Sequence, residues 1–346
     1  MIDPAKLAAW RERFSNDRPH QTEAPAFRKA AALGFKDDGR RNLPYSGIPT
    51  LLSAPWRPEA PDLPDFGGLE VALIGVPMDL AVTNRAGARL GPRAVRNIER
   101  IGPFHPALGI APMAERRTAD VGDVPFRSRF HLQESLEDIE AFMRRVVASG
   151  VRPLSVGGDH SISYPILRAI GRDRPVGLVH IDAHCDTSGV YDGSRFHHGG
   201  PFRQAVLDGV LDPARTIQIG IRGGGEYLWE FSFETGMTVI HAYEIDTLGI
   251  ERVIARAREV VGDAPFYVSF DVDGIDPAYT PGTGTPEVGG LTPREAQSIL
   301  RGLAGLNVIG GDVVEVAPQY DPTTVTAQIG AQMAFEILSL LALAPR

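Results

Sequence analysis

The stretch Leu178-Val-His-Ile-Asp-Ala-His-Cys-Asp186 joins an apolar run directly to three side chains that could bind a metal ion. Short apolar runs without alternation are typical of strands that are covered on both faces, as in a parallel sheet. In an extended backbone, side chains two residues apart point to the same side. Asp182, His184 and Asp186 are therefore expected to lie together at the carboxyl end of a buried strand.

Two other apolar runs end in a similar way. Tyr267-Val-Ser-Phe-Asp-Val-Asp273 places two carboxylates after a strand, and Gly157-Gly-Asp-His-Ser161 places a histidine after another. The two glycines let the chain turn sharply, so that a side chain can face the strand ends. Together the three motifs supply two His and four Asp: His160, Asp182, His184, Asp186, Asp271 and Asp273.

The rest of the chain alternates predicted strands and amphipathic helices. Strands are expected at 71–76, 153–156, 176–181, 216–220, 237–241, 266–271 and 308–315. Helices are expected near 91–96, 132–147, 201–209, 244–260, 292–304 and 326–342. This βα alternation predicts a three-layer α/β domain over residues 67–346, with its chemistry at the carboxyl ends of the strands. Residues 1–66, rich in proline and charge, are predicted to form an N-terminal arm with a short helix at 4–14.

Composition excludes several classes of function. The 346 residues carry a net charge of −8, and Lys and Arg are scattered, so no continuous basic face for nucleic acid is expected. The first residues resemble no signal peptide, and no run approaches the ~18 apolar residues of a membrane span. We expect a cytoplasmic protein that binds neither nucleic acid nor membrane. The single cysteine, Cys185, cannot form an internal disulfide and is expected to pack as a small apolar residue.

The six His and Asp side chains predict a metal site. A single Asp at a strand end is usually a cap or turn residue, but four buried carboxylates without a cation would be costly in repulsion and desolvation. Oxygen ligands with two imidazoles suit Mn²⁺, and the absence of thiolate ligands argues against a structural zinc site. Six ligands suffice for two ions only if Asp182 and Asp271 bridge them, which would place the ions about 3.5–4 Å apart and generate a hydroxide at neutral pH.

The three motifs resemble the metal signatures of the ureohydrolases, the arginase and agmatinase family. Other matching stretches are Tyr45-Ser-Gly-Ile-Pro49, Asn84-Arg-Ala-Gly-Ala-Arg-Leu-Gly-Pro-Arg93, Gly282-Thr-Gly-Thr-Pro-Glu287 and Val314-Glu-Val-Ala-Pro318. The resemblance implies an arginase-like fold with a mostly eight-stranded parallel sheet. It also implies a hydrolase that splits a small guanidino compound into urea and an amine through a metal-bridging hydroxide.

The resemblance assigns a role to each candidate residue. His160 and Asp186 would bind one divalent ion, and His184 and Asp273 the other, with Asp182 and Asp271 bridging. Mn²⁺ is the expected metal, with Ni²⁺ or Co²⁺ as alternatives. His198, in Phe196-His-His-Gly-Gly200, would relay a proton to the leaving amine, and Glu315 would hold the guanidinium, whose paired N–H donors suit a carboxylate. A homo-oligomer, a trimer or hexamer, is implied, and a hetero-oligomer with a homologous subunit is an alternative.

The substrate is less well defined by the sequence. Arginases hold the amino-acid end of arginine with two asparagines, and this chain has Ser188 and Phe196 at those positions. We therefore expect a short-tailed substrate, such as guanidinobutyrate, guanidinopropionate or agmatine. Free guanidine or a biguanide such as metformin is an alternative for the same chemistry. The rival classes are a single-zinc deacetylase, which would not need the second histidine, and a catalytically silent subunit, which would be expected to have lost a ligand.

Overall fold

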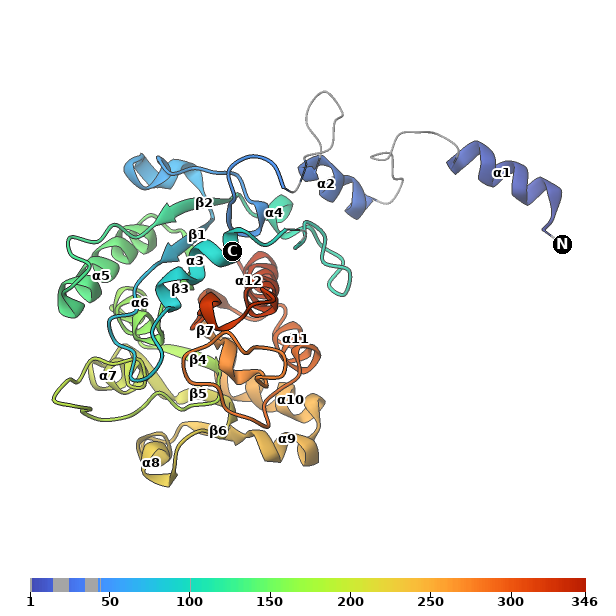
Figure 1. Ribbon diagram of the computed structural model, residues 1–346. Helices are drawn as coiled ribbons and strands as arrows, with labels where there is room; N and C mark the ends of the chain where they lie inside the picture. Colours follow the sequence, from blue (N-terminus) through green and yellow to red (C-terminus); the bar gives the residue numbers. More distant parts are fainter. Residues whose placement is uncertain (1, 15–24, 35–42, 44, 100) are drawn as a thin grey trace.

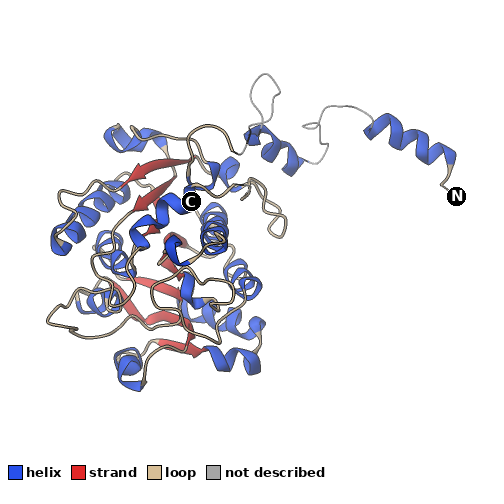
Figure 2. Ribbon diagram, in the orientation of Figure 1, coloured by secondary structure: helices blue, strands red, loops and turns tan. Residues whose placement is uncertain are grey.

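The computed structural model describes residues 2–14, 25–34, 43, 45–99 and 101–346 (Figure 1). Its centre is a sheet of eight strands, all parallel, in the order β2-β1-β3-β8-β7-β4-β5-β6. The strands are β1 (Val71–Val76), β2 (Thr118–Asp123), β3 (Arg152–Gly157), β4 (Val176–Ile181), β5 (Leu211–Ile221), β6 (Thr238–His241), β7 (Phe266–Asp271) and β8 (Val308–Val314). Figure 2 shows helices on both sides of this sheet. The predicted α/β architecture is confirmed.

Successive residues of each strand pack into opposite layers. In β1, Val71 and Leu73 join one core, whereas Ala72 and Ile74 join the other. The first core is covered by α3 (Gly91–Arg96), α9 (Ala242–Leu248), α10 (Ile250–Val261), α11 (Pro293–Arg301) and α12 (Val325–Leu343). The second core is covered by α5 (Leu132–Ala148), α6 (Ser163–Ile170) and α7 (Pro201–Leu207). Both faces of the sheet are therefore apolar, which explains why its strands show no alternation in the sequence.

The edge strand β2 was not expected, because Thr-Ala-Asp-Val-Gly-Asp has few apolar residues and an aspartate inside it. The structure shows how that aspartate is compensated. The buried Asp120 carboxylate accepts hydrogen bonds from Arg96 Nε (2.8 Å) and Nη2 (3.0 Å), and from the backbone N–H of Leu51 (2.8 Å). The ion pair with α3 thus compensates the buried charge in this strand, and no local pattern indicates the contact.

Two regions of helix also differ from the expectation. The helix predicted over 244–260 is two helices, α9 and α10, separated by Gly249, whose φ of 76° is incompatible with a continuous helix. The aromatic segment that begins at residue 226 forms the helix α8 (Glu226–Glu234), which lies beside β6 and was not predicted.

The chain before β1 has two kinds of structure. The helix α1 (Pro4–Phe14) buries none of its residues, and α2 (Pro25–Gly34) contacts the short helix α4 (Pro112–Glu115). Leu51 and Leu52, in contrast, pack into the main core. The division into an arm over 1–66 and a domain over 67–346 stays a prediction, and the packing of Leu51 favours an earlier boundary.

Within the described residues, one helix, α12, is long and apolar enough to cross a membrane by length and composition, which the sequence analysis did not expect. Its most apolar window is 72% buried inside the protein. The helix packs against β8, α11 and α3. Its apolar character is therefore explained by its place in the core.

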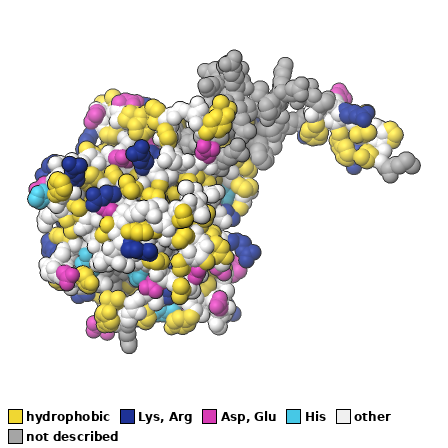
Figure 3. All heavy atoms as spheres, viewed as in Figure 1, with side chains coloured by type: hydrophobic (Ala, Val, Ile, Leu, Met, Phe, Trp, Pro, Cys, Tyr) yellow, Lys and Arg dark blue, Asp and Glu magenta, His cyan; other side chains and the backbone are white. Residues whose placement is uncertain are grey.

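Charged side chains lie scattered on the face shown in Figure 3, with acidic and apolar side chains between the Lys and Arg residues. This face has no continuous basic area of the kind that binds a phosphate backbone. The expectation that the protein does not bind nucleic acid stays a prediction.

Candidate metal centre

All the predicted site residues except His198 follow four strands that are neighbours at the centre of the sheet, in the order β3-β8-β7-β4. His160 follows β3, and Glu315 follows β8. Asp271 is the last residue of β7, and Asp273 follows it. The remaining ligand candidates follow β4: Asp182, His184 and Asp186. The carboxyl ends of parallel strands meet at one edge, so the topology brings together residues that are up to 155 positions apart.

His160 lies in the middle of one half of the cluster. Its Nδ1 atom is 2.9 Å from Asp186 Oδ2, 3.1 Å from Asp182 Oδ2 and 3.4 Å from Asp271 Oδ2. All four side chains are more than nine-tenths buried. Three carboxylates therefore converge on one imidazole nitrogen in a site with little access to water.

His184 lies in the other half. Its Nδ1 atom is 3.1 Å from Asp273 Oδ2 and 3.5 Å from Asp182 Oδ1. Asp182 thus turns one oxygen toward each histidine, as a carboxylate that bridges two ions would. The six side chains predicted as ligands are together, and their roles as ligands stay a prediction.

A buried hydrogen-bond network next to His160 fixes which of its two ring nitrogens carries the proton. Ser269 donates its only hydroxyl proton to Asp312 Oδ1 (2.6 Å), so it must accept from His160 Nε2 (2.7 Å). Asp312 is completed by the hydroxyls of Ser163 (2.6 Å) and Tyr267 (3.0 Å). The proton on Nε2 leaves Nδ1 as the nitrogen that can coordinate a cation.

The electrostatics of the cluster favour a cation. Burial and the charges of Asp273 and Asp182 raise the pKa of Asp271 well above its ordinary value. Burial, followed by the charge of Asp182, raises the pKa of Asp273 to about 6. A cation would remove this repulsion, and the donor set of carboxylate oxygens and imidazole nitrogens fits a divalent ion such as Mn²⁺.

The backbone reaches this arrangement differently from the extended array that the sequence suggested. The chain bends after Ile181, and Asp186 has a φ of 52°. The segment that carries Asp182, His184 and Asp186 is therefore bent and not extended. Gly158 has a different purpose from the predicted sharp turn. A Cβ atom there would lie 1.8 Å from the carbonyl oxygen of Met78, so glycine is needed for close approach of two backbones.

Cys185 is buried, as expected, and burial raises the pKa of its thiol to about 12. A thiol with such a pKa is not ionised at neutral pH and is a poor nucleophile. Cysteine chemistry is therefore not expected at this site.

Glu315 lies beside the cluster in a strained conformation, with a φ of 65°. Its Oε1 accepts from the backbone N–H of His160 (2.9 Å) and contacts His198 Nδ1 (2.8 Å). Its Oε2 is buried and has no hydrogen-bond partner in the described part of the chain. Because a strained residue with a free buried acceptor is costly, Glu315 is a candidate for binding a ligand.

His198 has partners for two protonation states. Its Nε2 lies 3.1 Å from the backbone N–H of Thr83, which can donate to it, and 2.7 Å from Thr83 Oγ1, which can accept from it. Burial disfavours the charged imidazole, but the charge and hydrogen bond of Glu315 outweigh it and raise the pKa of His198 to about 9. A histidine that can keep or release a proton at one nitrogen is suited to proton transfer.

A cavity of about 400 Å³ opens beside these residues. Asp186, His198 and Asp271 line it, and Tyr191, Tyr227 and Leu228 are among its apolar lining residues. Phe196, which stands at one of the two asparagine positions, does not line this cavity; its ring stacks on that of Tyr164, with 5.7 Å between the ring centroids. Ser188 does line it.

Sequence reasoning missed four buried polar residues around the cluster: His180, Gln218, Ser269 and Asp312. A signal existed for His180, since it precedes Asp182 by two residues and continues the spacing of the motif. For Ser269 and Asp312 the local sequence gives no such signal, because their partners come from neighbouring strands.

Comparison with known proteins agrees with this geometry. The model of the arginase family matches residues 69–339. The guanidinopropionase of Pseudomonas aeruginosa is 51% identical, over 86% of this chain and 93% of that protein. The guanidinobutyrase of the same organism is 42% identical, over 88% of this chain and 95% of that protein.

Solved structures share the fold. The proclavaminate amidino hydrolase of Streptomyces clavuligerus superposes with a TM-score of 0.82 and 34% identity, over 87% of this chain and 99% of that one. The formiminoglutamase of Trypanosoma cruzi with Mn²⁺ gives a TM-score of 0.73 and 25% identity, over 81% and 95% of the two chains. With its parallel sheet, its cluster of His and Asp at the strand ends and these matches along most of its length, the chain belongs to the arginase family.

Proposed function

We propose that this hydrolase binds two divalent metal ions and splits a small, short-tailed guanidino compound into urea and an amine. The observation that carries the proposal is the position of Asp182, whose two oxygens face His160 and His184 in a cluster of buried acceptors. The guanidino substrate is also consistent with relatives named guanidinopropionase and guanidinobutyrase.

The distances support most of the proposed ligand sets: His160 and Asp186 would hold one ion, His184 and Asp273 the other, and Asp182 would contact both. Asp271, whose Oδ2 lies 3.4 Å from His160 Nδ1, is proposed as the second bridging carboxylate on the family resemblance. Mn²⁺ is the proposed metal, because hard oxygen donors dominate and because a related structure contains Mn²⁺. Ni²⁺ and Co²⁺ are the alternatives. When bound, the ions would supply the positive charge that makes water nucleophilic at neutral pH.

The substrate-binding role falls to Glu315. Its free Oε2 is an acceptor without a donor, and a planar guanidinium offers the paired N–H groups that such a carboxylate binds. Because Glu315 also contacts His198, the guanidinium and the proton donor would lie against the same carboxylate. His198 would then protonate the nitrogen that leaves as the C–N bond breaks. Once Nε2 has given up its proton, it can accept a hydrogen bond from the backbone N–H of Thr83.

Removing one charge from a bridging carboxylate should disable the metal centre. Asp182→Asn or Asp271→Asn is expected to lose at least one ion and nearly all activity. Each of these carboxylates would hold both ions, and no other residue could take over that contact. Elemental analysis after dialysis and a urea assay would measure both. Asp263→Asn, a change at an exposed aspartate, is the matched control and should retain metal and activity. Two ions still bound to Asp271→Asn would contradict the assignment.

Loss of the proton donor should affect turnover and leave the metals in place. His198→Ala is expected to lower kcat by about 10²–10⁴, the usual effect of removing a general acid, with unchanged metal content. His131→Ala, at an exposed histidine, serves as the control and should turn over normally. A fully active His198→Ala enzyme would remove His198 from the mechanism.

The enzyme should prefer guanidino compounds with a short tail that lacks the amino-acid end of arginine. Ser188 stands where arginases carry an asparagine, and it lines the cavity. We expect the highest kcat/KM for guanidinopropionate, guanidinobutyrate or agmatine and negligible activity on arginine, measured as urea release with each metal in turn. Arginine as the best substrate would refute the interpretation of Ser188. If guanidine or a biguanide were best, the tail assignment alone would be wrong.

We also propose a homo-oligomer, a trimer or hexamer, in which the N-terminal segment contacts a neighbouring subunit. The support is that α1 buries none of its residues within its own chain, although Trp10 and Phe14 are large apolar side chains. Sedimentation at micromolar concentration should give an oligomer, and deletion of residues 1–14 should weaken it. A full-length chain that sediments as a monomer would refute this proposal.

A further inference from the structure

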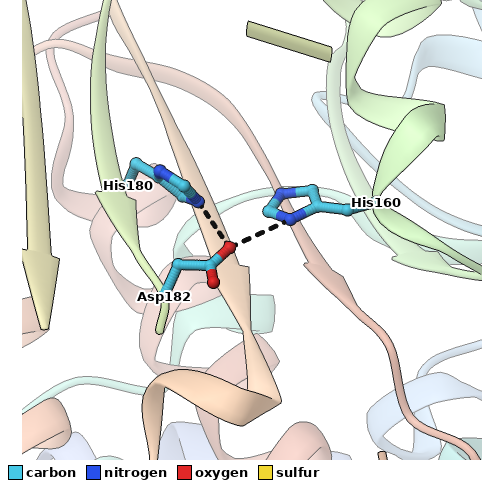
Figure 4. A group of neighbouring side chains, drawn as sticks. All are labelled: His160, His180 and Asp182. Carbon is cyan, nitrogen blue, oxygen red and sulfur yellow. Dashed lines mark hydrogen bonds and ion pairs between the residues drawn. The ribbon is translucent and has the colours of Figure 1, made fainter. Parts of the chain in front are cut away.

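His180 lies directly behind the carboxylate that faces both halves of the metal centre. Its Nε2 atom is 2.7 Å from Asp182 Oδ2, and both side chains are fully buried. Figure 4 shows His180 and His160 approaching the same carboxylate oxygen from different sides. His180 has no part in the proposed ligand set, so its contact with Asp182 needs a separate explanation.

A second buried side chain, Gln218 of β5, fixes the proton on His180. The Gln218 amide nitrogen donates to the backbone carbonyl of Cys185 (2.5 Å) and to His180 Nδ1 (3.1 Å). A carbonyl oxygen can only accept, so the nitrogen end of the amide must face it. His180 Nδ1 therefore accepts, and its proton is on Nε2, the atom that faces Asp182.

This proton decides between two roles for His180. A ring nitrogen that carries a proton has no free lone pair, so His180 cannot bind an ion through Nε2 while it is held by Gln218. It can donate a hydrogen bond to Asp182 instead. We infer that His180 and Gln218 are positioning residues, which orient Asp182 so that its two oxygens serve the two metal ions.

The orientation of Asp182 is fixed at both ends by this arrangement. Its Oδ2 accepts from His180, and its Oδ1 accepts from the backbone N–H of His184 (2.6 Å). A carboxylate held at both oxygens cannot rotate about its last bond, so it presents a preformed geometry to the ions. Outer hydrogen bonds of this kind typically affect metal affinity by about 10–100-fold. The inference rests on the proposed metal pair.

His180 also packs in the core, with its ring 4.5 Å from that of Phe202. A simple loss of packing must therefore be separated from the loss of the hydrogen bond. His105 provides the control, because it is an equally buried histidine that contacts Glu336, a residue outside the proposed metal centre (2.6 Å).

The experiment compares Mn²⁺ binding to His180→Leu, Gln218→Leu and His105→Leu by calorimetry, with the melting temperature of each metal-free protein as a measure of folding. His180→Leu is expected to weaken binding by about 10–100-fold while two ions still bind at saturation. Gln218→Leu should weaken it in the same direction, because His180 can then turn an unprotonated nitrogen toward Asp182. His105→Leu should lower the melting temperature and leave Mn²⁺ affinity unchanged.

The double variant provides a further readout that a general packing defect would not reproduce. Because Gln218 acts through His180, adding Gln218→Leu to His180→Leu should weaken Mn²⁺ binding no further. The electron paramagnetic resonance spectrum of the bound Mn²⁺ pair should change in both single variants and stay unchanged in His105→Leu.

Two results would overturn the inference. One is unchanged Mn²⁺ affinity in Gln218→Leu, which stays informative even if His180→Leu does not fold. The other is binding of a single ion at saturation to His180→Leu, which would make His180 a ligand. Failure of the proposed function would be seen separately, as the absence of urea release by the unmodified protein with every guanidino compound.

Discussion

Four buried carboxylates within reach of two imidazoles impose the main physical constraint on this protein. Burial first, and then the repulsion between neighbouring negative charges, raises the pKa values of Asp271 and Asp273. The surrounding structure serves to hold these groups together despite that repulsion. The Ser269 hydroxyl contacts His160, and the His180 imidazole contacts Asp182. Backbone N–H groups donate to one oxygen each of Asp182, Asp271 and Asp273.

The parallel sheet makes this concentration of charge feasible. Its four central strands end at one edge and are covered on both faces by apolar layers. The core therefore supplies the stability, and the strand ends are free to carry polar groups that contribute little to it. Strain is located at the same edge, at Asp186 and Glu315, where the backbone adopts positive φ values to aim side chains at the centre.

Much of this arrangement could be predicted from local pattern, and the remainder could not for a definite reason. Apolar runs followed by His and Asp gave the strand ends and the six candidate ligands, although the stretch after Ile181 curls where extension was assumed. The strand β2 escaped prediction because Asp120 is stabilised by Arg96, which lies 24 positions away. Gln218 and Asp312 escaped for the same reason, since their partners lie on neighbouring strands and not in their own sequence neighbourhood.

The residues that line the cavity come from two kinds of structure, the ends of strands and the loops that connect them to helices. Asp271 lies at the end of β7, whereas Ser188, Tyr191, Tyr227 and Leu228 stand on a connecting loop and at the start of α8. Loops of this kind accept substitutions and insertions at small cost to the core. Substitution of these four residues can therefore change the shape of the cavity and leave the residues at the strand ends in place. A single ancestral enzyme could in this way give rise to descendants that differ only in the tail they accept.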